Sequence, residues 1–369
     1  MVKEAWKLNR TNFKQPLILN TISFFGMKSS DNIHKLGQMS KVIVIGTSAG
    51  GLHALTKLIS QLPKNFAAPV LVVQHISADA VGNVLLDTLN KLNTLHCVHA
   101  ENGMELVPGH LYLAPSDQHL MTDQQGKILV TKGAHENRSR PAIDPLFRSA
   151  AVAFGRRLIG IILTGYLDDG TAGLKVIQRC GGTCIIQDPK DAQYPDMPQN
   201  ALNQVKPDYL VPISAMGGLL ERLATIMPEE SKPVPEDILI EAKIAERVLS
   251  DLPAVNALGD QVPFNCPGCG GVLWQVDKGS ALRFRCHVGH AYTSASLLAE
   301  QTKKMEETMW TALRMFEERK NLLTTMSKGQ KGAALQSSLE RAKLSEVHIG
   351  RIKAILLADD KGTSGDIPN

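Results

Sequence analysis

A serine flanked by small residues is the first candidate for chemistry in this sequence. Gly46-Thr47-Ser48-Ala49-Gly50-Gly51 directly follows a run of apolar residues and fits the nucleophile-elbow pattern G-x-S-x-G. Small neighbours allow a sharp turn from strand to helix, which lifts the Ser48 hydroxyl above the edge of a sheet. A glycine loop that cradles phosphate is the competing interpretation, but the dinucleotide spacing G-x-G-x-x-G and the P-loop lysine are both missing.

A histidine and a pair of aspartates end two further apolar runs. His75 ends one of them, and Asp168 and Asp169 follow the run at 158–165. The carboxyl ends of parallel strands meet at one edge of a sheet, where catalytic groups gather. A lone histidine there is more often a bystander, but beside Ser48 it predicts nucleophilic chemistry, with an aspartate to orient the ring. The chain order serine, histidine, aspartate differs from that of the α/β-hydrolases.

Three cysteines and a second histidine have the spacing of a zinc ribbon. Cys266 and Cys269 form a C-x2-C pair, and Cys286 and His290 follow it with C-x3-H spacing. Four protein ligands complete a tetrahedral site and leave no open position, so the predicted zinc is structural and not catalytic. A redox or disulfide pair is the alternative interpretation.

The elements that must position these residues alternate along the chain. Apolar runs typical of strands lie at 41–45, 68–75, 158–165 and 182–187. Helical patterns lie between them at 51–62, 144–154 and 172–180. Continuous apolar strands between helices are typical of a parallel sheet that is covered on both faces. We therefore predict a doubly wound α/β fold with a mostly parallel sheet, followed by a small zinc ribbon and a helical hairpin. Residues 98–130 favour shorter strands and turns, with an antiparallel side piece as one arrangement.

The hairpin is predicted from two long helical segments. Apolar residues recur at three-to-four spacing within 296–326, and a Lys- and Gly-rich break separates this segment from 332–358. Such spacing indicates amphipathic helices joined by a turn. Packing within the chain and docking of a partner both explain an apolar face of this kind.

Composition excludes several classes of protein. Of the 369 residues, 43% are hydrophobic and 21% are charged, as in ordinary globular proteins. Six cysteines are too few for a secreted disulfide scaffold, and no apolar run of about 18 residues predicts a membrane span. Residues 1–38 hold six basic and two acidic residues, which accounts for the net charge of +4. Because the rest is neutral, we expect neither a nucleic-acid partner nor membrane insertion.

Several of these motifs resemble the catalytic domain of the chemotaxis protein-glutamate methylesterases, the CheB family. The resemblance covers about 40–226 and rests on short motifs in the same order and spacing. These are the Ser48 motif, Gln74-His75-Ile76, 111–115 (LYLAP), 140–147 (RPAIDPLF), 163–170 (LTGYLDDG) and Met197-Pro198. The resemblance implies a doubly wound domain that hydrolyses glutamate γ-methyl esters on chemoreceptors and often deamidates receptor glutamines.

The resemblance also implies roles for individual residues. Ser48, His75 and Asp169 match the family's catalytic triad, and the backbone N–H groups of Ala49 and Tyr166 match its oxyanion donors. Asp168 falls on a variable position, where we expect a solvated loop charge. The family commonly has methionine where Tyr166 stands, which changes the wall of the pocket but not a backbone role.

Besides Tyr166, this chain departs from the family pattern in a segment that the family uses for regulation. The family usually carries an N-terminal receiver domain, whereas only about 40 residues precede the first predicted strand. We therefore expect no control by phospho-aspartate within this chain. We expect any control of the activity to act through the C-terminal segments, which are the linker, the ribbon and the hairpin.

We thus expect a cytoplasmic serine hydrolase that demethylates a chemoreceptor or another signalling protein and releases methanol. No cofactor is expected for catalysis, and zinc is expected only as a structural ion. A catalytically weak signalling scaffold of the same fold and a serine esterase for another small ester are the alternatives. The predicted segments are a disordered or mis-assigned leader (1–39), the methylesterase domain (40–228), a linker with one helix (229–261), the ribbon (262–295), the hairpin (296–358) and a loose tail (359–369).

Overall fold

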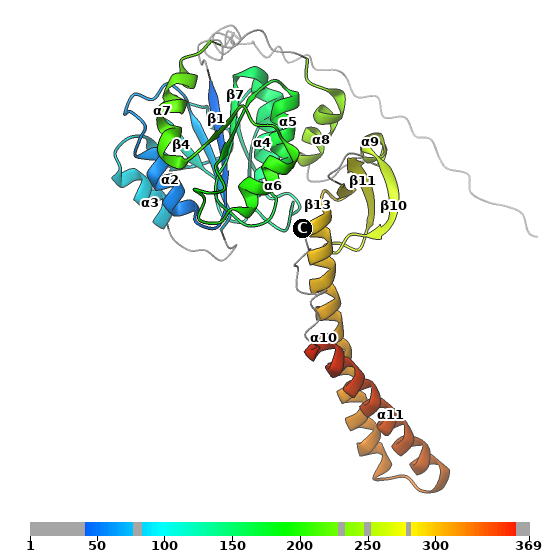
Figure 1. Ribbon diagram of the computed structural model, residues 1–369. Helices are drawn as coiled ribbons and strands as arrows, with labels where there is room; N and C mark the ends of the chain where they lie inside the picture. The colour runs from blue at the N-terminus through cyan, green and yellow to red at the C-terminus, as the bar shows by residue number, and fades with distance from the viewer. Residues whose placement is uncertain (1–40, 77–82, 228–232, 247–251, 278–281, 359–369) are drawn as a thin grey trace, which may run out of the picture. The chain divides into compact units, whose positions relative to one another are not determined.

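Seven parallel strands form the central sheet of the computed structural model (Figure 1). The structure describes residues 41–76, 83–227, 233–246, 252–277 and 282–358, so the predicted leader and tail lie outside the described residues. The sheet has the order β3-β4-β2-β1-β7-β8-β9, and every neighbouring pair is parallel. Its strands are β1 (Val42–Thr47), β2 (Val70–Gln74), β3 (His96–His99), β4 (His110–Leu113), β7 (Leu158–Ile162), β8 (Thr183–Gln187) and β9 (Tyr209–Val211).

The strand order reverses at β1, which places a crevice at the carboxyl ends of three strands. β2, β4 and β3 lie on one side of β1, and β7, β8 and β9 lie on the other. Gly46 of β1 pairs with Val73 of β2 and with Ile162 of β7, so the three strands end at the same level. Doubly wound sheets bind their ligands at such a switch point.

Helices cover both faces of the sheet (Figure 1). One face carries α2 (Gly51–Ile59), α3 (Val84–Lys91) and α7 (Ile213–Ala224), and the other carries α4 (Ile143–Phe154), α5 (Thr171–Arg179) and α6 (Asp196–Gln204). All residues of β1 and β7 are buried, which explains why both sequences are continuously apolar instead of alternating. The predicted doubly wound fold with a mostly parallel sheet is confirmed.

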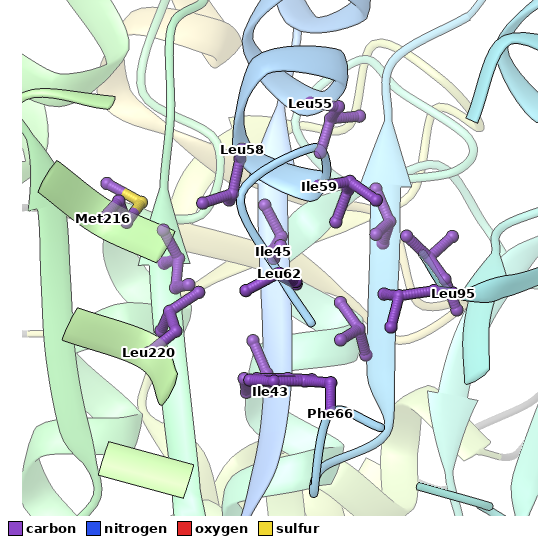
Figure 2. Close-up of a cluster of buried hydrophobic side chains, with 14 of the residues drawn as sticks. Ile43, Ile45, Leu55, Leu58, Ile59, Leu62, Phe66, Leu95, Met216 and Leu220 are labelled. Atoms are coloured by element: carbon purple, nitrogen blue, oxygen red, sulfur yellow. The ribbon is translucent and has the colours of Figure 1, made fainter. Parts of the chain in front are cut away.

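The core beneath the crevice holds α2 in a fixed position. Figure 2 shows Ile43 and Ile45 of β1 beside Leu58 of α2, with Met216 and Leu220 of α7 next to them. These side chains are almost completely buried. Each buried side chain of this size contributes about 1.5–3 kcal/mol, so the turn that connects β1 to α2 is anchored at both ends.

The chain between 96 and 131 differs from the predicted antiparallel side piece. Only β5 (His119–Thr122) and β6 (Ile128–Thr131) form a separate antiparallel pair, whereas β3 and β4 are parallel members of the central sheet. Three of the eight residues in β3 and β4 are histidines, so neither strand has a continuous apolar sequence. β3 lies at the edge of the sheet, where polar residues are tolerated.

The C-terminal segments form two short helices, a second sheet and the predicted hairpin. α8 (Glu236–Glu246) and α9 (Leu252–Leu258) occupy the segment in which one helix was predicted. The strands β10 (Asp260–Asn265), β11 (Val272–Asp277), β12 (Arg283–Cys286) and β13 (Ala291–Thr293) form an antiparallel sheet, which we call the ribbon. α10 (Ser294–Ser327) and α11 (Gly332–Leu357) confirm the hairpin. Among the described residues, no helix has the length and apolarity to cross a membrane.

Candidate active site

Ser48 lies in the turn that leads from β1 into α2. Its backbone N–H donates to the carbonyl oxygen of Thr164 (3.1 Å), and its own carbonyl oxygen accepts from the side-chain amide of Gln74 (2.7 Å). The same amide donates to the carbonyl oxygen of His75 (2.9 Å). Gly50 caps α2 with φ of 76°, a left-handed conformation that glycine adopts without strain. The backbone around Ser48 is therefore held by its neighbours, and the hydroxyl is left for other contacts.

The loop after β7 passes directly against Ser48. A Cβ atom at Gly165 would lie 2.6 Å from Sδ of Met197 and 2.7 Å from Cβ of Ser48. Only glycine allows this approach, which brings the backbone of Tyr166 next to the serine. Tyr166 is 52% exposed, and its ring lies against that of Tyr194, with ring centroids 4.7 Å apart.

The side chains of Ser48, His75 and Asp169 form one hydrogen-bonded line. Nδ1 of His75 lies 3.2 Å from Oγ of Ser48, and Nε2 lies 2.7 Å from Oδ2 of Asp169. The backbone N–H of His75 donates to the carbonyl oxygen of Thr47 (3.0 Å), which fixes the residue to the end of β1. With its Nε2 proton donated to Asp169, the neutral ring has Nδ1 available to accept a proton from Ser48.

The Asp169 carboxylate is 3% exposed and accepts five hydrogen bonds. Besides His75, the donors are the backbone N–H groups of Ile143 (2.7 Å), Gly170 (3.0 Å) and Asp144 (3.3 Å) and the side chain of Asn137 (2.9 Å). Burial by itself would raise the pKa of Asp169, but the hydrogen bond and charge of His75 and the other donors outweigh it and lower the pKa. The carboxylate therefore stays ionised beside the histidine.

Asp168 has a different environment and was predicted incorrectly as a solvated loop charge. It is half-buried, and its Oδ1 accepts a hydrogen bond from Oγ1 of Thr293 (3.2 Å) at the end of the ribbon. Burial raises its pKa, opposed by the Thr293 hydrogen bond. The carboxylate that hydrogen-bonds to His75 belongs to Asp169.

Two backbone N–H groups beside Ser48 are available to a ligand. Within the described part of the chain, the N–H groups of Ala49 and Tyr166 donate to no protein acceptor. Ala49 directly follows Ser48, and Tyr166 directly follows Gly165, whose backbone approaches Cβ of Ser48. Free N–H groups of this kind can stabilise an oxyanion that forms on a substrate.

A groove of about 680 Å³ borders Ser48. Leu52 and Ile76 line it close to the serine, and Val84 and Leu113 continue the lining. Leu52 and Val84 are exposed to solvent although both are large and apolar. The groove therefore suits an uncharged, partly aliphatic part of a substrate.

The four predicted metal ligands converge at one end of the ribbon. The ligand atoms of Cys266, Cys269, Cys286 and His290 all lie within 4.8 Å of one another. Sγ of Cys269 is 3.7 Å from Sγ of Cys286, which is in turn 3.5 Å from Nδ1 of His290. Zinc–sulfur bonds of about 2.3 Å in a tetrahedron separate two sulfurs by about 3.8 Å. The three cysteines are free thiols, so this set could hold a zinc ion.

A cluster of buried charges, which was not predicted from the sequence, lies beside the site. It joins Glu136, Arg148 of α4, Glu241 of α8, and Arg283 and Arg285 of β12. All five side chains are at most 11% exposed. Three separate segments of the chain contribute to the cluster, so no local spacing could have predicted it.

The chain matches a known family over its first half. Residues 43–220 match the family model described as CheB methylesterase. A relative from Leptospira interrogans serogroup Icterohaemorrhagiae serovar copenhageni, provisionally named protein-glutamate methylesterase/protein-glutamine glutaminase, is 37% identical over 183 residues, which cover 50% of this chain and 94% of the relative. A relative from Syntrophus aciditrophicus with the same type of name is 34% identical over 193 residues, or 52% of this chain and 55% of the relative.

A solved structure matches the same part of the chain. The crystal structure of the Thermotoga maritima CheB methylesterase catalytic domain is 36% identical and has a TM-score of 0.47. The match covers 50% of this chain and 98% of that domain. The family model ends before α8, the ribbon and the hairpin.

Gly165→Ala tests the close approach of the β7 loop to Ser48. The added methyl group would displace either Ser48 or the loop, and a misplacement of about 1 Å can lower a rate about 100-fold. We expect a fluorophosphonate probe to label Ser48 about 10- to 100-fold more slowly, while thermal unfolding shows a folded protein. Gly218→Ala on α7 is the matched control, because a Cβ there has no neighbour within 4 Å. Equal labelling rates in both variants would contradict the close approach.

Proposed function

The chain belongs to the CheB methylesterase family, and on that premise we propose that its serine hydrolase site cleaves γ-methyl esters of glutamate in a signalling protein. The hydrogen-bonded line from Ser48 through His75 to Asp169 is the observation that carries the proposal. The names of the relatives support the same reaction and a second one, deamidation of glutamine. Ester and amide differ only in the group that leaves, methanol or ammonia.

We assign the two chemical steps as follows. Oγ of Ser48 attacks the ester carbonyl carbon while Nδ1 of His75 takes the serine proton. The N–H groups of Ala49 and Tyr166 stabilise the oxyanion of the tetrahedral intermediate. His75 then gives its proton to the departing methoxy group, so methanol leaves and glutamyl-Ser48 remains. A water molecule, deprotonated by His75, hydrolyses this ester and regenerates Ser48 with a free glutamate carboxylate.

Asp169 acts in both steps through His75. Its carboxylate keeps the proton on Nε2, which leaves Nδ1 as the base, and it stabilises the imidazolium that forms after proton transfer. Five hydrogen bonds fix the carboxylate, so little reorganisation accompanies the appearance of positive charge on His75. This pre-organisation supports assigning the triad role to Asp169.

The groove supports a methylated glutamate as substrate. A γ-methyl ester is uncharged and carries methylene groups that suit the Leu52 and Ile76 walls. The carboxylate product is charged, so the same apolar walls favour its release. We propose a methylated chemoreceptor as the partner and the cytoplasm as the place of action, in keeping with the family's role in chemotaxis.

We further propose that the ribbon binds one structural zinc ion and that the predicted segment boundaries hold to within about two residues, with two helices in the linker instead of one. The methylesterase domain at 40–228 contains the family match, and the ribbon at 262–295 contains the four converging ligands. Zinc would tie the turn at Cys266 and Cys269 to the turn at Cys286 and His290. It would take no part in the hydrolysis, because four protein ligands fill its coordination sphere.

Asp169→Asn and Asp168→Asn separate the two adjacent carboxylates. An amide at 169 favours the wrong histidine tautomer, and we expect turnover to fall about 10⁴-fold with the fold retained. An amide at 168 can still accept the Thr293 hydrogen bond, so we expect a loss of about tenfold or less. The measurement is methanol release from a methylated receptor, with Ser48→Ala as the inactive reference. The opposite ranking of the two variants would move the triad role to Asp168.

Cys286→Ser tests the metal site. The sulfur of Cys286 lies close to both Cys269 and His290, and the ribbon has only a small apolar core of its own. We expect elemental analysis to find one zinc ion per wild-type chain and much less in the variant, whose ribbon should lose protection from proteolysis. His287→Ala is the control, because His287 does not belong to the converging set. Wild-type protein that purifies with an ordered ribbon but without metal would refute the assignment.

A further inference from the structure

The ribbon reaches the proposed triad through one amide side chain. The backbone N–H of Asn137 donates to the carbonyl oxygen of Ala291 (2.9 Å), and the N–H of Ala291 donates to that of His135 (3.4 Å). Residues 135–137 of the body, by which we mean the methylesterase domain that contains the central sheet, thus pair with β13. Oδ1 of Asn137 accepts from the N–H of Thr293 (3.2 Å), and its Nδ2 donates to Oδ1 of Asp169 (2.9 Å).

Asn137 is well suited to this position. Its φ of 48° is left-handed, a conformation that asparagine tolerates better than most residues. The side chain is buried, and Nδ2 also donates to Oδ2 of Asp144 (2.8 Å). Burial and the nearby charge of Asp169 raise the pKa of Asp144 to about 7. The neutral amide therefore lies between two carboxylates that would otherwise repel each other at close range.

The buried charges fix the ribbon against the body at this point. Nη2 of Arg285 on β12 lies 2.6 Å from Oε1 of Glu136, the residue before Asn137, and Nη2 of Arg148 lies 2.8 Å from the same oxygen. The side chains of these three charged residues are at most 4% exposed. Breaking a buried ion pair leaves an uncompensated charge and is strongly destabilising. The cluster therefore favours a single docked position of the ribbon.

Thr293 joins this contact to the catalytic loop and to the hairpin. Its Oγ1 lies 3.2 Å from Oδ1 of Asp168, the neighbour of Asp169. Oγ1 of Thr293 also accepts from the N–H of Ser296 (3.1 Å) and caps the first turn of α10. The end of β13 is thus connected to both aspartates of the loop that follows β7.

We propose that Asn137 is a positioning residue for Asp169 and that the docked ribbon holds it in place, so that the C-terminal module completes the active site. The inference rests on the proposed role of Asp169 in orienting His75. It assigns the ribbon a part in the hydrolysis without any contact with the substrate. Positioning of this kind changes the rate of the chemical step and not the binding of substrate.

Two substitutions at Asn137 test the proposal in the full-length chain. Asn137→Gly keeps the left-handed backbone but removes the amide, and Asn137→Asp keeps the shape but replaces the donor with an acceptor. We expect kcat to fall about tenfold in the glycine variant and further in the aspartate variant, with KM within about twofold of wild type. A residue that only supplies the left-handed backbone would be replaced by glycine without loss of kcat.

Labelling of Ser48 by a fluorophosphonate gives a readout independent of the protein substrate. The probe needs the activated serine but no receptor, so its rate should fall in parallel with kcat. Ser294→Ala is the control, because Ser294 is exposed at the same junction and its hydroxyl donates to the carbonyl oxygen of Leu282 (3.2 Å). Reduced labelling in both Asn137 variants without methanol release by wild type would uphold the positioning role and reject the methylesterase proposal. Unchanged kcat and labelling in both variants would overturn the positioning role, whatever the substrate.

A double-variant cycle tests the route through the ribbon. Arg285→Met removes the ribbon's charge from Glu136 and should lower Ser48 labelling to a similar extent. If the ribbon acts through Asn137, the double variant with Asn137→Gly should lose little more than either single variant. Multiplied losses would show that the two residues act independently and would overturn this route. If Arg285→Met fails to fold, the two Asn137 variants decide the proposal by themselves.

Discussion

The buried carboxylate of Asp169 is the constraint on which the rest of the site depends. An ionised carboxylate with 3% exposure is stable only if its oxygens are satisfied, and five donors satisfy them here. Two of those donors are backbone N–H groups at the start of α4, one belongs to the loop after β7, and one is a side chain held by the ribbon. The carboxylate therefore requires the sheet, the helix and the C-terminal module to meet at one place.

The parallel sheet supplies the other two members of the line. Since β1, β2 and β7 end at the same level, Ser48 after β1 and His75 after β2 lie within reach of the loop that carries Asp169. Gly165 lets that loop approach Ser48, and the core around Leu58 holds the helix that follows the serine. The chemistry thus follows from strand order and from close packing at single positions.

The sequence predicted what depends on local pattern. β1, β2, β7 and β8 have continuous apolar sequences because both of their faces are covered, and the spacing of Cys266, Cys269, Cys286 and His290 is a local property of two turns. β3 and β4 were missed as sheet members because histidines interrupt their apolar sequences. β3 is the edge strand, where polar residues are tolerated, and β4 lies between β3 and β2. Asn137, and the partners of the buried arginines, depend on contacts between distant segments, which spacing along the chain does not encode.

The central claim is that Ser48 catalyses cleavage of the acyl–oxygen bond of a glutamate γ-methyl ester, and isotope transfer combined with the Ser48→Ala variant tests it most directly. A methylated receptor is incubated with the chain in water enriched in heavy oxygen, and the glutamate and the methanol are analysed by mass spectrometry. We predict that the label enters the glutamate carboxylate, that the methanol contains none, and that Ser48→Ala produces neither labelled glutamate nor methanol. Label in the methanol, or undiminished methanol release by Ser48→Ala, would contradict the claim.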